Sequence, residues 1–178
     1  MYQISSLFLD VARIEAKTFK LAKEQLNLVD VLSNAIDDQI IAISPSKRNK
    51  VKLKYTPTKD HILIDADRIR MTQVIFNLLN NAVKFTNEGI ISITLEKEKN
   101  KAIVRIQDSG IGIDSDIMPN LFSKFATKSD IGGTGLGLYI TKSIIEAHGG
   151  TIIAGNNQNQ DGNRGATFTF SLPLSGQR

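Results

Sequence analysis

NLLNNAVKF, residues 77–85, lies in the strongest helical pattern of the chain, which predicts a helix over residues 67–86. Asn77, Asn81 and Lys84 stand at positions i, i+4 and i+7, so they share one helix face, with leucines behind them. Amide oxygens are hard ligands suited to Mg²⁺, and a lysine ammonium binds phosphate as a point charge. Taken alone, the pattern is explained at least as well by a solvated helix face.

A second motif, DSGIGI at residues 108–113, follows an apolar stretch expected to form a strand over 102–108. A carboxylate at the end of a strand can accept a hydrogen bond from an exocyclic amine such as that of adenine. The glycines behind it let the backbone approach a flat ring closely. A tight turn capped by the aspartate is the alternative interpretation.

A third motif, GGTGLGL at residues 132–138, opens a helix expected over 135–147. A glycine-rich turn at the start of a helix presents free backbone N–H groups to an anion. The motif lacks the Gly-Lys-Ser/Thr ending of a P-loop, and its spacing differs from the dinucleotide-binding fingerprint. The alternative is a flexible linker.

The remaining patterns predict an α/β two-layer sandwich in which helices cover one face of a sheet. Residues 1–25 read as a helix that cannot close a core alone and needs a partner. A second helix is expected over 26–43, with Asp30 as its N-cap and a stop at Ser44-Pro45-Ser46. Short links between neighbouring strands indicate antiparallel pairs. The further strands are expected at 50–55, 61–64, 90–97, 151–155 and 166–172.

Composition and charge exclude several classes of function. The 178 residues carry a net charge of +4, and much of the excess lies between Lys47 and Lys59. Lys50, Lys52 and Lys54 alternate with apolar residues, which is typical of the solvated face of a strand rather than a nucleic-acid patch. The absence of cysteine excludes disulfides and thiolate metal sites. With no apolar run long enough to span a bilayer and no secretory signal at Met1, we expect a cytoplasmic setting without membrane contact by this chain.

Together the three motifs resemble the ATP-binding domain of sensor histidine kinases, in the superfamily shared with gyrase, chaperone and mismatch-repair ATPases. The resemblance runs from about Asp65 to Pro173 and includes FSKF at 122–125 and GATF at 165–168, in the family's order and spacing. It implies a Bergerat-type sandwich, with a mixed sheet covered by helices on one face and preceded by a helical stub.

The resemblance also implies a role for each site residue, with ATP and Mg²⁺ as cofactors. Asn81 would coordinate Mg²⁺, Asn77 would support that site, and Lys84 would contact the phosphates; these three form the expected catalytic group. Phe85 would pack near adenine, and Asp108 would bind its amine. Gly110, Gly112 and Ile113 would shape the base pocket, and Thr167 would lie near the base. The remaining residues expected to bind nucleotide belong to the lid over the triphosphate (Lys124, Lys128, Gly133, Thr134, Gly135, Leu136, Gly137, Leu138). In this lid, Thr134 and Leu136 would offer backbone N–H groups, and Phe122 and Phe125 would act as anchors.

The expected activity follows from position 77. ATPases of the superfamily carry a glutamate one turn before the magnesium asparagine as general base for water, and here that place is Asn77. A neutral amide cannot take a proton from water, so phosphoryl transfer to a protein side chain fits better than hydrolysis. The expectation is a protein histidine kinase of two-component signalling. A catalytically silent ATP-binding interaction module and an anti-sigma-type serine kinase remain alternatives.

Neither His61 nor His148 lies in the setting of a phosphoacceptor, and both are interpreted as structural. FLDVARIEA, residues 8–16, resembles the end of the family's second dimerisation helix. We therefore expect residues 1–25 to belong to a dimerisation domain and 26–178 to the catalytic domain, with the histidine-bearing helix preceding Met1 in a longer protein. The expected partners are that dimerisation domain, of the same or a sister chain, and a response-regulator receiver domain. A homodimer is expected only where that helix is present, and the sequence does not say whether the parent protein is membrane-anchored.

Overall fold

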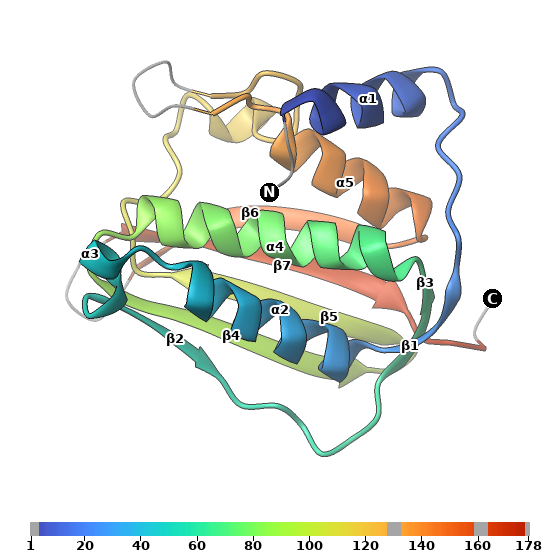
Figure 1. Cartoon of the computed structure of the whole chain (residues 1–178), viewed down its shortest axis with the longest axis horizontal. Coiled ribbons are helices and arrows are strands. Elements are labelled where there is room, and N and C mark those ends of the chain that lie inside the picture. The colour runs from blue at the N-terminus through green and yellow to red at the C-terminus, as the bar shows by residue number, and fades with distance from the viewer. Residues whose placement is uncertain (1–3, 128–132, 159–163, 177–178) are drawn as a thin grey trace.

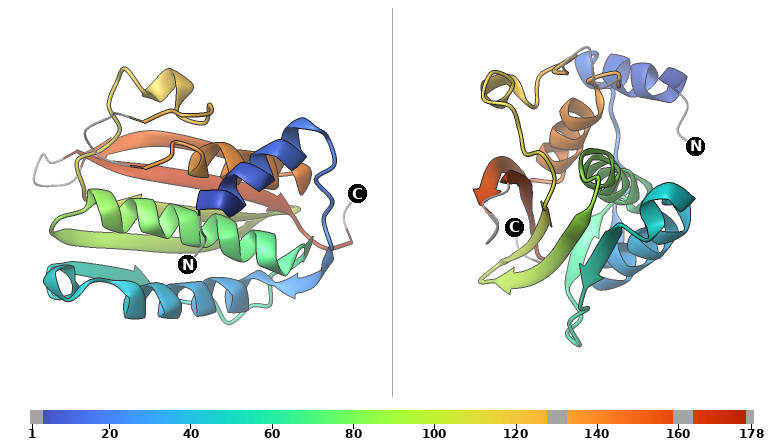
Figure 2. Two further views of the ribbon diagram at one scale, coloured as in Figure 1. Left: turned by 45° about the horizontal axis from the view of Figure 1, so that its top comes forward. Right: turned by 90° about the vertical axis from the view of Figure 1, so that its left-hand side faces the viewer.

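The computed structural model describes residues 4–127, 133–158 and 164–176. A five-stranded mixed sheet forms one layer, and α2, α4 and α5 cover one of its faces (Figure 1), so the predicted two-layer α/β sandwich is confirmed. In the described part of the chain, no helix covers the opposite face of the sheet (Figure 2). The elements are α1 (Ile4–Glu15), β1 (Glu24–Asn27), α2 (Leu28–Ala42), α3 (Pro45–Arg48), β2 (Val51–Tyr55), β3 (Leu63–Ala66), α4 (Arg68–Phe85), β4 (Gly89–Glu98), β5 (Lys101–Asp108), the 3₁₀ turn η1 (Met118–Asn120), α5 (Gly137–Ala147), β6 (Thr151–Gln158) and β7 (Arg164–Pro173).

The strand order of the sheet is β2-β4-β5-β7-β6. Neighbours along the chain, β4 with β5 and β6 with β7, pair antiparallel as predicted, whereas β2 pairs parallel with β4. The register of β5 against β7 sets Gln107 opposite Thr167, so the end of β5 at Asp108 lies beside Ala166. Lys52 and Lys54 on β2 are exposed, as their alternation with apolar residues predicts.

Helix α4 forms the centre of the helical layer, between α2 and α5. Asp67 is its N-cap and accepts a hydrogen bond from the backbone N–H of Arg70 at 3.1 Å. Its buried stripe packs on the sheet and on α2 (Met71, Val74, Ile75, Leu78, Leu79, Ala82). The apolar residue Ile69 does not belong to this stripe; it is 67% exposed because it lies roughly 200° around the helix from Met71.

The prediction that residues 1–25 form one helix is wrong. Helix α1 ends at Glu15, where Thr18 bonds back to the carbonyl of Arg13 through its N–H, and the chain then extends into β1. Strand β1 pairs antiparallel with β3, which buries Leu26 and Ile64 together. Helix α1 finds the partner it needs in α5, over which it lies (Figure 1).

Two other local expectations are also corrected. Asn27, not Asp30, caps α2, because its side-chain oxygen accepts from Val29 N–H at 3.4 Å and also from Ile62 N–H at 3.1 Å. The predicted end of α2 before Ser44-Pro45-Ser46 is confirmed, and Pro45 then opens the four-residue helix α3. Strand β3 begins at Leu63, so His61 lies before it. Within the described residues, no helix is both long and apolar enough to cross a membrane.

His148 joins the end of α5 to the start of α4. It is buried at the C-cap of α5, where its Nε2 accepts from the backbone N–H of Asp67 at 3.0 Å and its Nδ1 lies 2.7 Å from the carbonyl oxygen of Ile144. Because Nε2 accepts, the neutral ring carries its proton on Nδ1 and donates it to Ile144. Burial lowers the pKa of His148 below its ordinary value of 6.5. These contacts agree with the structural role predicted for His148.

We expect this buried imidazole to make the fold less stable in acid. Below pH 6.5, His148 is protonated in the unfolded chain but stays neutral in the folded chain, because its pKa in the folded chain is lower. The free energy of unfolding therefore falls as the pH drops from 6.5 towards that lower pKa. Urea unfolding at about pH 7.5 and about pH 5.5 should show a loss of about 1 kcal/mol that is absent in His148→Gln. The exposed His61 provides the control, since His61→Gln should behave like the parent chain. Equal acid sensitivity in His148→Gln would contradict the assignment.

Candidate active site

A cleft of about 570 Å³ opens between α4, the turn after β5, the segment around residues 121–127, the turn at 133–138 and β7. Its volume is in the range of small-molecule sites in proteins. Residues from all three sequence motifs meet there, although they are far apart in the chain. Twelve of the predicted site residues line it (Asn77, Asn81, Lys84, Phe85, Asp108, Gly112, Ile113, Gly133, Thr134, Gly135, Gly137, Leu138).

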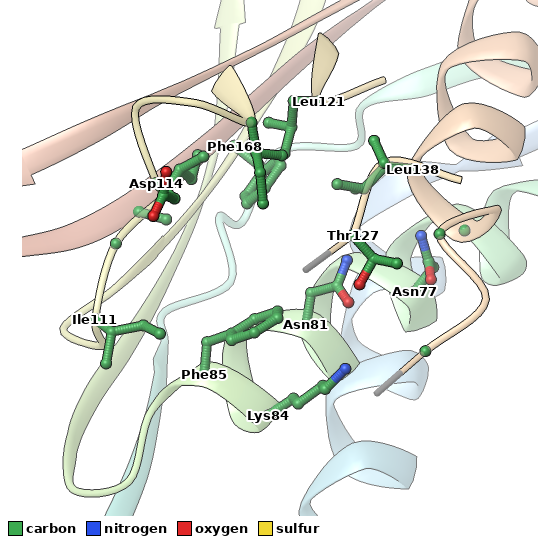
Figure 3. Close-up of a pocket in the computed structure, with 18 of the residues that line it drawn as sticks. Asn77, Asn81, Lys84, Phe85, Ile111, Asp114, Leu121, Thr127, Leu138 and Phe168 are labelled. Atoms are coloured by element: carbon green, nitrogen blue, oxygen red, sulfur yellow. The ribbon is translucent and has the colours of Figure 1, made fainter. Parts of the chain in front are cut away.

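Helix α4 forms the polar wall of the cleft. Figure 3 shows Asn77, Asn81, Lys84 and Phe85 along this helix, each one facing the cleft, as their helical spacing requires. Asn81 is half-buried, and the ammonium of Lys84 lies 5.0 Å from the centre of the Phe85 ring. The wall therefore combines an amide, a cation and an aromatic ring within two turns of one helix.

Asn77 joins α4 to α5. Its Nδ2 donates a hydrogen bond to the hydroxyl of Thr141 at 2.8 Å, and Thr141 is buried. A Cβ added to Gly137 would lie 2.5 Å from Asn77 Oδ1, so only glycine lets the first turn of α5 approach this closely. Asn77 thus fixes the glycine turn and the start of α5 against the helix that carries Asn81 and Lys84.

Asp108 lies at the opposite end of the cleft and is 4% exposed. Both hydrogen bonds that the described residues make to its carboxylate reach Oδ1, from the backbone N–H groups of Gly110 at 2.8 Å and Ala166 at 3.2 Å. Burial outweighs these two bonds and raises the pKa of Asp108 above its ordinary value of 3.8. The arrangement holds the carboxylate in one orientation, with Oδ2 able to accept a further donor.

The glycine turn is hydrogen-bonded to the segment that precedes it. Phe125 N–H donates to the carbonyl of Gly135 at 3.0 Å, and both residues have positive φ, 62° and 64°. The Phe122 ring packs edge-on against Phe168, with 6.5 Å between ring centres. Phe122 therefore anchors this region through its ring, whereas Phe125 is 61% exposed and contributes its backbone.

The structure places four predicted residues outside the cleft, each for a local reason. Leu136 is buried in the core, and Gly110 packs behind the cleft, where an added Cβ would lie 2.3 Å from the Phe85 carbonyl oxygen. Thr167 alternates with the cleft residues Ala166 and Phe168 along β7, so it faces the other side of the sheet. Lys124 forms an ion pair with Glu15 of α1 and lies 5.9 Å from the centre of the Tyr139 ring. Lys128 lies outside the described residues.

Ten lining residues were not predicted, and the reasons differ. Leu7 comes from α1, whose packing over this site has no local signal in the sequence. Ala166 and Phe168 could have been found from strand alternation once Asp108 was placed next to β7. The others extend the two glycine-containing segments (Ile111, Asp114, Ser115, Ile117, Leu121, Ala126, Thr127).

Known proteins are similar to this chain in both fold and sequence. The family model described as histidine kinase-, DNA gyrase B- and HSP90-like ATPase matches residues 66–176. The catalytic domain of the histidine kinase ThkA, in a nucleotide-free form, is 30% identical with a TM-score of 0.69, and the match covers 85% of this chain and 97% of that one. Full-length ShkA in complex with AMPPNP is 28% identical with a TM-score of 0.74, and the match covers 95% of this chain and 35% of that one.

Curated relatives extend the comparison to whole proteins. The sensor protein KdpD of Clostridium acetobutylicum is 36% identical over 171 residues, and the sensor histidine kinase WalK of Bacillus subtilis is 30% identical over 182 residues. The matches cover 93% and 97% of this chain but only 18% and 28% of those proteins. The family match and the structural neighbours identify this sandwich with its cleft as a nucleotide-binding ATPase domain. The chain belongs to the histidine kinase-, DNA gyrase B- and HSP90-like ATPase family, as a catalytic domain of the histidine-kinase type.

Proposed function

We propose that this chain binds Mg²⁺-ATP in the cleft and transfers the γ-phosphoryl group to a histidine of a dimerisation domain, as part of two-component signalling. The observation that carries the proposal is the row of Asn77, Asn81 and Lys84 on one wall, facing the glycine turn, with the buried carboxylate of Asp108 at the other end. The polar row suits a triphosphate and its metal, and the carboxylate suits the base.

At the base end, Oδ2 of Asp108 accepts a hydrogen bond from the adenine amine. The two backbone N–H groups on Oδ1 hold the carboxylate in place for this contact. Phe85, Ile111 and Phe168 line the cleft and provide apolar surface for the ring. Guanine carries a carbonyl oxygen where adenine has its amine, so the same carboxylate would repel it.

At the triphosphate end, Lys84 meets the phosphates as a cation, and the turn at residues 133–135 offers backbone N–H groups ahead of α5. Asn81 is the residue that would hold Mg²⁺ through its amide oxygen. Among the described residues there is no cluster of three or more His, Cys, Asp and Glu side chains that could hold a metal, which fits an ion bound through few protein ligands plus phosphate oxygens and water. When bound, Mg²⁺ neutralises charge on the transferring phosphoryl group.

In the transfer step, a neutral imidazole nitrogen of the acceptor histidine attacks the γ-phosphorus. The new P–N bond forms as the bond to the β–γ bridging oxygen breaks, and ADP leaves with that electron pair. The residues of this chain position the triphosphate and screen its charge rather than exchange protons. The side chain of Asn77 is a neutral amide that is hydrogen-bonded to Thr141, so it cannot take a proton from water. Its presence at this position therefore disfavours hydrolysis.

The proposed partners are the histidine-bearing dimerisation domain and a response-regulator receiver domain. We propose α1 as the end of a dimerisation helix. Because β1 pairs with β3, we place the start of the catalytic unit between Glu15 and Glu24, slightly before the boundary expected from the sequence. The ion pair between Glu15 and Lys124 supports a direct contact between α1 and the catalytic unit.

The test has two stages. Titration with a fluorescent ATP analogue should show binding that strengthens with Mg²⁺. The chain should then phosphorylate a separately purified dimerisation domain from the same system, and not the same domain with its histidine replaced by alanine. Steady ATP turnover without an acceptor would contradict the role given to Asn77. Tight binding without transfer to the correct domain would favour a silent binding module.

A further inference from the structure

The C-terminal turn of α4 is held by a residue outside the cleft. The last carbonyl groups of a helix have no partner within it and need donors from elsewhere. Lys47, on α3, supplies them: its ammonium lies 2.8 Å from the carbonyl oxygen of Val83, 3.1 Å from that of Lys84 and 3.0 Å from that of Thr86. A lysine has three N–H donors, so each carbonyl can accept one of them.

The same turn carries two side chains of the proposed nucleotide site, Lys84 and Phe85. The carbonyl of Phe85 accepts from Ile111 N–H at 3.3 Å, so the turn is fixed from both sides, by Lys47 and by the glycine motif after β5. Lys47 itself does not line the cleft. Its positive charge also offsets the negative end of the helix dipole, close to the place where Lys84 would meet phosphate.

We infer that Lys47 is a positioning residue for nucleotide binding, which acts by fixing the turn from which Lys84 and Phe85 extend into the cleft. The inference rests on the proposed function, because it assigns a consequence for nucleotide affinity to a contact that lies outside the nucleotide site. A residue with only a structural role would change the stability of the fold without a selective effect on the ligand.

The next residue in the chain provides a matched control. Arg48 donates through Nη2 to the carbonyl oxygens of Ile41 at 3.2 Å and Ile43 at 3.3 Å, at the end of α2. Lys47 and Arg48 thus extend from the same short helix and each caps a helix C-terminus. Only the helix capped by Lys47 carries residues that line the cleft.

The experiment compares Lys47→Met, Lys47→Arg and Arg48→Met with the parent chain. Titration with a fluorescent ATP analogue and Mg²⁺ should show about tenfold weaker binding for Lys47→Met, because the turn loses both its charge and its three donors. Lys47→Arg should recover part of the affinity, since a planar guanidinium keeps the charge but does not direct three donors to converging acceptors. The nucleotide affinity of Arg48→Met should stay within about twofold of that of the parent chain, even where its stability to urea falls as much as that of Lys47→Met. In transfer assays with saturating acceptor, Lys47→Met should raise KM for ATP more than it lowers kcat.

Amide hydrogen exchange gives a second readout that needs no nucleotide. Lys47→Met should speed exchange at Thr86, whose N–H bonds to Ala82, whereas Arg48→Met should speed exchange at Ile43, whose N–H bonds to Gln39. Should Lys47→Met not fold, Lys47→Gln takes its place with the same expected direction. Affinity within twofold of the parent chain in the Lys47 variant, or an equal loss in Arg48→Met, overturns the inference. A parent chain that binds no nucleotide would instead refute the proposed function.

Discussion

Asn81→Ala is expected to remove the Mg²⁺-dependent part of ATP binding and to slow phosphoryl transfer by about 10²–10³-fold. The amide of Asn81 lies in the cleft on the same wall as Lys84, which makes it the protein ligand we propose for the metal. Without this ligand, the charge on the transferring group is less well screened when it matters most, in the transition state. The measurement is an ATP titration with and without Mg²⁺, followed by transfer kinetics to the dimerisation domain.

Asn80→Ala is the matched control for this variant. Asn80 is the preceding residue on α4, but it is exposed, lies outside the cleft and accepts a hydrogen bond from Gln39 at 3.1 Å. It should keep both the Mg²⁺ dependence and the rate of transfer. Should Asn81→Ala bind ATP with the same Mg²⁺ dependence as the parent chain, Asn81 would have no place in the metal site.

Asp108→Asn is expected to weaken ATP binding by about 10²-fold and to reduce the preference for ATP over GTP. The amide oxygen of the asparagine can still accept from Gly110 and Ala166, so the local structure should persist. Its amide nitrogen would then take the place of Oδ2 and set a donor against the donor of adenine. Competition between ATP and GTP for the fluorescent analogue measures the change in preference.

The same substitution should not destabilise the protein without nucleotide. The pKa of Asp108 is raised in the folded state, so the folded chain holds a proton there more firmly than the unfolded chain, and ionisation above the ordinary value of 3.8 costs stability. Asp108→Asn removes that cost, and urea unfolding near pH 7 should show equal or higher stability, by about 1 kcal/mol. The difference in stability between Asp108→Asn and the parent chain should disappear towards about pH 4. Asp116→Asn, at an exposed position outside the cleft, is the control and should change neither the preference for ATP over GTP nor the stability. If Asp108→Asn keeps the full preference for ATP, the adenine contact is contradicted.

Sequence patterns within single segments were enough to predict the main helix, several strands and one wall of the site. The apolar stripe of α4 and the alternation in β2, β4 and β5 specify the helix and the strands. The amide row on α4 is a local signal too, because helical spacing alone places Asn77, Asn81 and Lys84 on one face. The two glycine motifs indicated their turns, but that all three motifs share one cleft was implied only by the family resemblance.

What the sequence could not show depends on contacts between distant residues. Asp10 of α1 is buried and accepts from Arg70 Nη1 at 2.8 Å and from Gln73 Nε2 at 3.0 Å, which helps to hold α1 over the helical layer. No pattern within residues 1–25 identifies partners that lie 60 to 109 residues away along the chain. Neither the position of Leu7 in the cleft nor the pairing of Lys124 with Glu15 could therefore be predicted. The role of Lys47 could not be predicted for the same reason, since its three acceptors lie at the C-terminal end of another helix.

The amide at position 77 also bears on the lifetime of a bound ATP molecule. Its Nδ2 is committed to Thr141 and its Oδ1 faces Gly137, so this side chain is engaged in joining two helices and does not activate water. In the function we propose, bound ATP would then persist until it dissociates or an acceptor arrives. The rate of signalling would depend on how often the two domains meet, and a chain waiting for its partner would consume almost no ATP.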